Sequence, residues 1–149
     1  MYIRDLVQHW QEVRRDLLRA VDMLSDEQLA FTPREGLWPL GQVLRHIAQA
    51  EEYWFRFVVR RELSERPRFT AEQYATVAAI KGLLTEVHAR TEGYLLTLQE
   101  GDLDRVVTTP RGEQLTLRWI LWHVFEHEIH HRGEVFLMLG LLGMQAPDL

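Results

Sequence analysis

Cysteine is absent from the 149 residues of this chain. Its absence excludes disulfide bonds, thiolate metal sites and a cysteine nucleophile. Long apolar runs are also missing, because none approaches the ~18 residues that a membrane-spanning helix needs. Basic residues are scarcer than acidic ones, 17 against 22, and the net charge is −5. This balance argues against non-specific nucleic-acid binding, which requires a basic surface.

The first residues, Met1-Tyr2-Ile3-Arg4-Asp5, lack the basic stretch and apolar segment of a secretory signal. We therefore expect a cytoplasmic protein that contacts neither membrane nor nucleic acid. Hydrophobic residues make up 46% of the chain, which is enough for a sizeable core. The length suits one domain, so we predict a single domain over residues 1–149.

Apolar residues recur at helical spacing in four segments, residues 3–24, 38–62, 71–99 and 117–139. Four long amphipathic helices in so short a chain predict an all-α protein, a four-helix bundle. The long connections after the second and third helices permit either simple up-down or crossover topology. Between residues 101 and 116 the helical period breaks, and this segment predicts a small β-hairpin or an ordered loop.

Local signals refine the helix ends. The tetrapeptide Ser25-Asp26-Glu27-Gln28 predicts a capping box that opens one short turn. Thr70, followed by Gln73, predicts the start of the third helix. Gly140 is expected to end the fourth helix.

Histidine is the compositional oddity, with seven in the chain and four of them between residues 123 and 131. The apolar stripe of the fourth helix calls for apolar residues at 127 and 131, yet the sequence has His127 and His131. Histidines four apart lie on one helix face and can share a metal ion. On the second helix, His46 also borders the buried face. Burying an imidazole without a hydrogen-bond partner or metal ion costs free energy, and one divalent cation would bind all three of these histidines.

The other polar residues near these positions have simpler interpretations. We expect His9 and His88 to be core residues that hydrogen-bond to a neighbour. His123 and His130 lie off the face of the pair, at the surface or beside the ligands. Glu134 would either orient a ligand or the imidazole of His131, or form a salt bridge with Arg132 or the second helix, and we expect the salt bridge. Gly133 is expected to permit a close helix contact.

The segment from His127 to His131 also matches H-E-x-x-H, the zinc-protease signature, in which Glu128 would activate water. The extended form of that motif needs glycine at 134 and histidine at 137, where this chain has Glu134 and Leu137. Only 18 residues follow His131 in the 149-residue sequence, and nothing predicts the sheet edge that binds a peptide in such enzymes. A metalloprotease is therefore improbable.

Two segments carry a recognisable pattern. From Leu37 to Ile47, Trp38 precedes a helix and His46 closes the pattern. From His123 to Glu134, the chain matches H-x-x-x-H-x-x-x-H-R-G-[QE]. Together these segments resemble the DinB family, also called DinB/YfiT-like metal-binding bundles, and the resemblance covers nearly the whole chain. One departure is Pro39, where the family commonly has serine or threonine, and it affects the helix cap and no ligand.

The resemblance implies a four-helix bundle that holds one divalent metal ion through His46, His127 and His131, the same three residues that the stripe singled out. It also implies a homodimer, which surplus aromatics such as Trp10, Trp119 and Trp122 support weakly. Family members of known activity include thiol-dependent S-transferases and a maleylpyruvate isomerase, which use low-molecular-weight thiols.

Three neutral ligands would leave an open coordination position, which is typical of catalytic sites. Imidazole ligands suit several metals, and zinc or nickel is expected here. Two hypotheses follow. The first is a metal-dependent transferase that joins a small thiol to an electrophile. The second is a non-catalytic, dimeric metal-binding or scaffold protein, because no second catalytic residue stands out. The catalytic residues stay undetermined at this stage.

Overall fold

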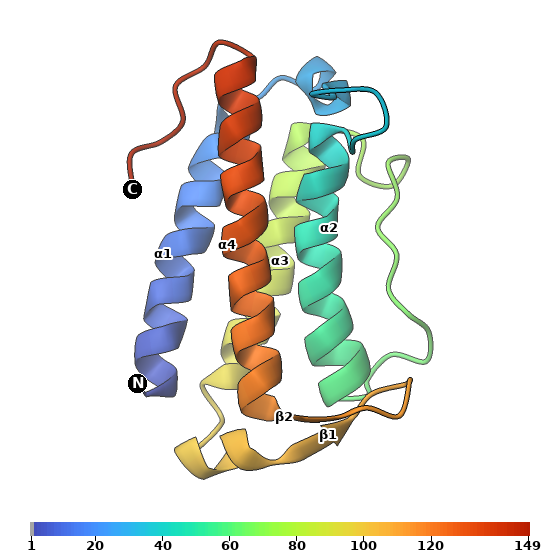
Figure 1. Cartoon of the computed structure of the whole chain (residues 1–149), viewed down its shortest axis with the longest axis vertical. Helices are drawn as coiled ribbons and strands as arrows, with labels where there is room; N and C mark the ends of the chain where they lie inside the picture. The colour runs from blue at the N-terminus through green and yellow to red at the C-terminus, as the bar shows by residue number, and fades with distance from the viewer. Residues whose placement is uncertain (1) are drawn as a thin grey trace.

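The computed structural model describes residues 2–149, and its four long helices form a bundle (Figure 1). The helices are α1 (Ile3–Asp22), α2 (Leu40–Glu52), α3 (Val77–Leu95) and α4 (Leu117–Leu141). Each of α1 and α2 packs against both α3 and α4. The predicted four-helix bundle is confirmed.

The chain runs up α1, down α2, down α3 and up α4 (Figure 1). Because α2 and α3 point the same way, the connection over residues 60–76 must return along the whole length of the bundle. Of the two topologies that the sequence left open, the structure has a crossover. In the described part of the chain, no helix is long and apolar enough to cross a membrane.

Short elements complete the fold. A π-helical segment, η2 (Tyr53–Val59), extends α2, and 3-10 turns occupy η1 (Glu27–Ala30) and η3 (Glu100–Asp104). The predicted hairpin forms from β1 (Val106–Thr108) and β2 (Gln114–Thr116), which pair antiparallel with Val107 opposite Leu115.

Some predicted boundaries need correction. The capping hydrogen bonds between Thr70 and Gln73 do form, but they close only a single turn, because α3 begins after Thr76, whose hydroxyl caps Ala79 N. The fourth helix runs one residue past Gly140, and the chain turns at Gly143, whose φ of +77° favours glycine.

Apolar side chains form two clusters stacked along the bundle, and a polar layer separates them. One cluster contains Leu17, Leu44, Leu84 and Val135, and the other contains Trp10, Phe55, Leu95 and Ile120. Between them each helix contributes buried polar side chains: Arg14, Glu51, His88, Thr91, Glu128 and His131. This layer at mid-bundle is where the candidate site lies.

Candidate metal centre

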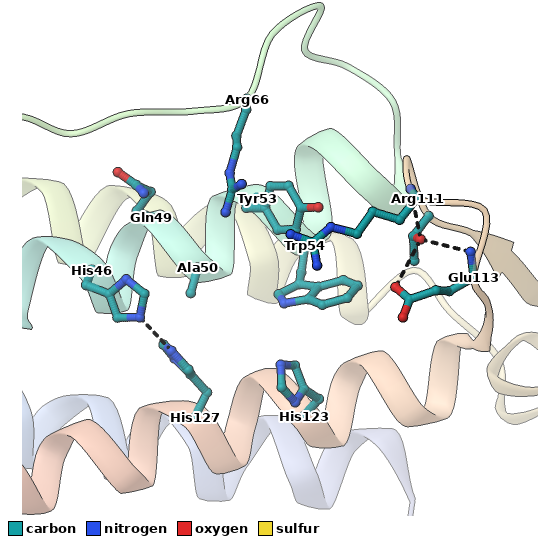
Figure 2. Close-up of a pocket in the computed structure, with 11 residues that line it drawn as sticks. His46, Gln49, Ala50, Tyr53, Trp54, Arg66, Arg111, Glu113, His123 and His127 are labelled. Carbon is teal, nitrogen blue, oxygen red and sulfur yellow. Dashed lines mark hydrogen bonds between the residues drawn. The ribbon is translucent and has the colours of Figure 1, made fainter.

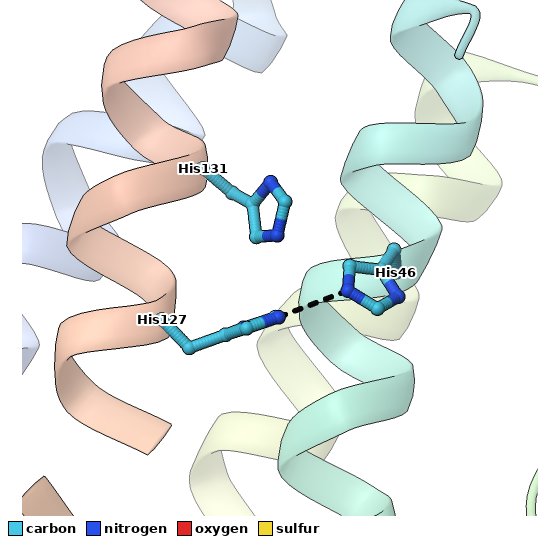
Figure 3. Close-up of side chains that lie close together, drawn as sticks. All are labelled: His46, His127 and His131. Carbon is cyan, nitrogen blue, oxygen red and sulfur yellow. Dashed lines mark hydrogen bonds between the residues drawn. The ribbon is translucent and has the colours of Figure 1, made fainter. Parts of the chain in front are cut away.

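Three histidines from two helices meet at the surface between α2 and α4 (Figure 3). His127 and His131 lie one turn apart on α4, and their ring centroids are 4.4 Å apart. His46 on α2 approaches both, with its Nε2 atom 2.9 Å from His127 Nε2. Each ring offers one nitrogen to a group whose atoms lie within 4.8 Å of one another. The structure therefore brings together the three residues that the sequence singled out.

The spacing of these nitrogens suits a small divalent ion. Two imidazole nitrogens bound to one tetrahedral zinc would lie about 3.3 Å apart, given bonds of about 2.0–2.1 Å. The His46–His127 separation of 2.9 Å needs only a small increase to reach that value. Trp38 flanks the centre, with its ring 4.8 Å from that of His46.

The surroundings of His46 and His127 favour the neutral imidazole, which is the form that binds a metal ion. Burial and, after it, the neighbouring imidazoles of His131 and His46 together lower the pKa of His127 to about 3. Burial also lowers the pKa of His46, and His131 acts in the same direction while Glu134 opposes it. Neutral rings at neutral pH present lone pairs to a cation.

Glu134 orients the imidazole of His131. Its carboxylate accepts a hydrogen bond from His131 Nδ1 at 2.7 Å, which leaves Nε2 of that ring for a metal ion. The predicted salt bridge of Glu134 with Arg132 or the second helix is wrong, because Arg132 instead lies 3.6 Å from Asp16. The structure instead confirms the alternative interpretation, in which Glu134 orients the imidazole of His131.

The remaining histidines and Gly133 also have definite places. His88 is buried and its Nδ1 donates to Glu51 at 3.0 Å, as expected of a core residue. His9 is exposed beside Glu12, so its prediction as a core residue is wrong. His130 is exposed. A Cβ at Gly133 would meet no atom within 4 Å, so the expected close helix contact is absent there.

A cavity of about 240 Å³ opens beside the three histidines, and His46 and His127 form part of its wall (Figure 2). His123 lines the same cavity and stacks on the ring of Trp119, with centroids 4.7 Å apart. The other lining residues come from the end of α2, η2, the crossover connection and the hairpin: Gln49, Ala50, Tyr53, Trp54, Arg66, Thr109, Arg111 and Glu113. A ligand at the histidine centre has room to extend into this space.

Sequence reasoning missed a buried ionic network directly behind the histidines. The guanidinium of Arg14 donates to Glu128 at 2.6 and 2.8 Å, to Glu51 at 2.6 Å and to the carbonyl of Leu84 at 2.6 Å. Trp10 Nε1 also donates to Glu128. Through these contacts Arg14 on α1 joins α2, α3 and α4 at one level.

The charges in this network stabilise one another. Burial alone would lower the pKa of Arg14, but the attraction of Glu128 and Glu51 outweighs it and the pKa is raised. For Glu51, burial acts to raise the pKa, yet Arg14 and the hydrogen bond from His88 lower it to about 2. One feature of the sequence could have revealed this network. Arg14 lies on the buried stripe of the first helix, between Trp10 and Leu17.

The network also explains the H-E-x-x-H match. Glu128, the residue that would activate water in a zinc protease, is only 2% exposed and accepts hydrogen bonds from Arg14 and Trp10 in the core. It lies on the face of α4 that is turned away from the cavity. Glu128 is not among the residues that line the cavity, so it is not placed to activate a water molecule there.

Residues 9–135 match the family model of the DinB superfamily. The chain belongs to the DinB superfamily. It is 26% identical over 153 residues to a Bacillus subtilis protein named "Putative metal-dependent hydrolase YfiT", covering 90% of this chain and 84% of that one.

Solved structures of DinB-like proteins share the fold. The crystal structure of a Bacillus cereus DinB-like protein has a TM-score of 0.82 and 22% identity, and the match covers 100% of this chain and 99% of that one. A mycothiol-dependent maleylpyruvate isomerase has a TM-score of 0.66 and 15% identity, and the match covers 91% of this chain and 61% of the isomerase. At these identities the two matches show the fold alone.

Proposed function

We propose that this DinB protein is a metal-dependent enzyme that transfers a small thiol to an electrophile. His46, His127 and His131 would bind one divalent ion, zinc or nickel. The observation that carries the proposal is the convergence of three imidazoles, of which those of His46 and His127 line a cavity. The name of YfiT supports metal dependence, and the mycothiol-dependent isomerase of the same fold supports a thiol.

The donor set fits a catalytic rather than a closed structural site. Three neutral ligands would leave the metal ion with its full +2 charge and with an open coordination position. An ion held there would supply Lewis-acid chemistry that lowers the pKa of a thiol, so that a nucleophilic thiolate forms near neutral pH. Because the chain has no cysteine, the sulfur comes from a cosubstrate.

The protein residues would bind the ion and hold its ligands in position. Glu134 fixes the ring of His131, and the Arg14 network fixes α2 against α4, so that the three rings meet in one place. In the transfer a sulfur–carbon bond forms while the bond from that carbon to its leaving group breaks. The thiol proton passes to solvent, so this chemistry needs no protein base beside the ion.

Hydrolysis is a second candidate, which the name of YfiT favours. It requires a general base near the attacking water. Glu128 is in the core, and the carboxylate that lines the cavity is Glu113, whose Oε2 lies 3.3 Å from the Thr109 hydroxyl that donates to it. Glu113 would therefore have to act as the base.

One assay separates these functions from a non-catalytic scaffold. Metal-loaded protein is incubated with a small thiol and an activated aryl chloride, and chloride release is measured beside cleavage of activated esters without thiol. Thiol-dependent release that His127→Ala abolishes supports the transferase. Ester cleavage alone would favour the hydrolase. No turnover, with the spectrum of the cobalt-loaded protein unchanged by every thiol, would favour the scaffold.

We also propose a homodimer in solution. The predicted surplus of aromatics needs one correction, because Trp10 is buried at 1% exposure, whereas Trp119 and Trp122 are 47% and 39% exposed. Both exposed indoles lie near the start of α4 and would gain from burial against a second copy. Light scattering over a range of concentrations is expected to give twice the chain mass, and a monomer mass throughout would contradict the proposal.

A further inference from the structure

The cavity beside the histidine centre has a cationic end. Arg66 reaches into it from the crossover connection, and Arg111 reaches into it from the hairpin (Figure 2). The Arg66 guanidinium carbon lies 4.7 Å from the centroid of the Tyr53 ring. Two segments far apart in the sequence thus direct positive charge at one small space.

This charge is not neutralised within residues 2–149. The arginines that form ion pairs there are Arg14, Arg19, Arg56, Arg60, Arg90, Arg118 and Arg132. Glu113 also lines the cavity, but the two guanidinium groups outnumber its single carboxylate. In a chain of net charge −5, a cavity of net positive charge is a local exception. Guanidinium groups of this kind bind carboxylates and phosphates, often through two parallel hydrogen bonds.

The lining and the volume of the cavity indicate the size and polarity of the rest of the ligand. Ala50, Tyr53 and Trp54 give apolar surface between the histidines and the arginines. A volume of about 240 Å³ suits a molecule smaller than a typical drug. A separate cavity of about 350 Å³, which Trp38 and Phe69 help to line, adjoins His46 and leaves room for a second reactant.

We propose that the thiol cosubstrate carries a carboxylate, which Arg66 and Arg111 bind while its sulfur reaches the histidine centre. This inference rests on the proposed thiol transfer. We assign this cavity to the thiol rather than to the electrophile. The sulfur would have to reach an ion held by His46 and His127, and these two side chains form part of the cavity wall. Arg66 and Arg111 are then specificity-determining residues.

Matched pairs of thiols test the charge requirement. Zinc-loaded protein is titrated calorimetrically at about pH 8, where histidine is neutral, with 3-mercaptopropionate against 3-mercaptopropanol and with 6-mercaptohexanoate against 6-mercaptohexanol. Members of a pair share the sulfur and chain length and differ in charge. For at least one length, the acid is expected to bind about tenfold more tightly than the alcohol, as a charge-assisted hydrogen bond allows.

Arginine variants assign the preference to its residues. Arg66→Gln and Arg111→Gln should each remove most of the preference for the acid and leave binding of the alcohol unchanged. Arg15→Gln, an exposed arginine of α1 outside this cavity, is the matched control and should behave as wild type. If the acid and the alcohol bind with equal affinity at both chain lengths, the proposed carboxylate site is overturned, whereas the proposed binding of a thiol is not. Failure of all four thiols to bind would overturn the proposed function and this inference with it.

Discussion

Two polar clusters interrupt the apolar core side by side, and they satisfy their polar groups in different ways. Around Arg14, the guanidinium donors meet the oxygens of Glu51 and Glu128, so the positive charge is already matched inside the protein. Around His127, three imidazole nitrogens face one another, and no protein cation of the described residues stands between them. The first cluster contains its own cation, although the buried Nε2 of the neighbouring His88 has no hydrogen-bond partner among the described residues. The second cluster offers lone pairs to a ligand.

The comparison shows why side-chain type alone does not identify a metal site. Glu51, His88 and Glu128 also lie close enough together to be a potential metal-binding group. Arg14 already supplies the cation among them, however, so a metal ion would compete with a buried guanidinium. What distinguishes the histidine cluster is its lack of an internal cation together with its opening onto a cavity.

The largest expected effect comes from breaking the cluster around Arg14. Arg14→Met leaves two buried carboxylates without their cation and should lower the free energy of unfolding by about 3–5 kcal/mol. Chemical unfolding of the metal-free protein measures this change. Adding Glu51→Gln and Glu128→Gln to the same variant removes the uncompensated charge and should recover much of the loss. A small effect of Arg14→Met alone would contradict the structural role of the network.

Breaking the histidine cluster should change metal binding rather than folding. Purified wild-type protein is expected to hold close to one divalent ion per chain, as measured by elemental analysis. His127→Ala and His46→Ala should abolish this retention, because two ligands hold an ion much less firmly than three. His9→Ala alters an exposed histidine outside the centre and is the control. Stoichiometric metal in His46→Ala would remove α2 from the site.

Glu134 tests the orientation of a ligand without removing one. Glu134→Ala removes the acceptor for His131 Nδ1 and should weaken metal affinity by about 10–100-fold. Glu134→Gln keeps an oxygen acceptor and should recover part of that affinity. Competition with a chelator measures both values. If Glu134→Ala binds metal as wild type does, the hydrogen bond has no part in ligand positioning.

Acid should destabilise the two clusters in overlapping pH ranges, and the histidine cluster should respond first as the pH falls. The pKa of His127 is about 3 in the folded, metal-free protein and about 6.5 when unfolded, so protons bind preferentially to the unfolded chain. Stability is therefore lost as pH falls from about 6.5 towards about 3. The pKa of Glu51 drops from 4.5 to about 2 on folding, so its contribution is present above 4.5 and lost between these values.

Thermal unfolding followed over pH separates the two contributions. The first decline, below about 6.5, should weaken in His127→Ala, whereas the decline below 4.5 should persist. Added metal should raise the melting temperature near pH 7 and lose this effect towards pH 5, because protons compete for the same nitrogens. A profile that stays flat between pH 7 and pH 5 with metal present would contradict the three-histidine site.

The sequence by itself determined the elements and the position of the histidines. Helical spacing is local, so α1 and α4 could be placed within a few residues, and turn chemistry indicated the hairpin. The second helix was predicted to reach residue 62, whereas α2 ends at Glu52 and the π-helical η2 continues it to Val59. The start of α3 was misplaced because the cap at Thr70 is locally sound but opens only one turn. His127 and His131 could be paired because spacing on one helix follows from helix geometry.

Only the tertiary structure decided which polar groups are satisfied. The partners of Glu128 lie on another helix, more than one hundred residues away in the sequence, so no local pattern could show that Arg14 occupies its carboxylate. The same holds for the cavity, because Arg66 and Arg111 come from a crossover connection and a hairpin tip whose positions depend on the path of the chain. Hydrogen bonds and charges act over a few ångströms in space, and that proximity is a property of the packed bundle.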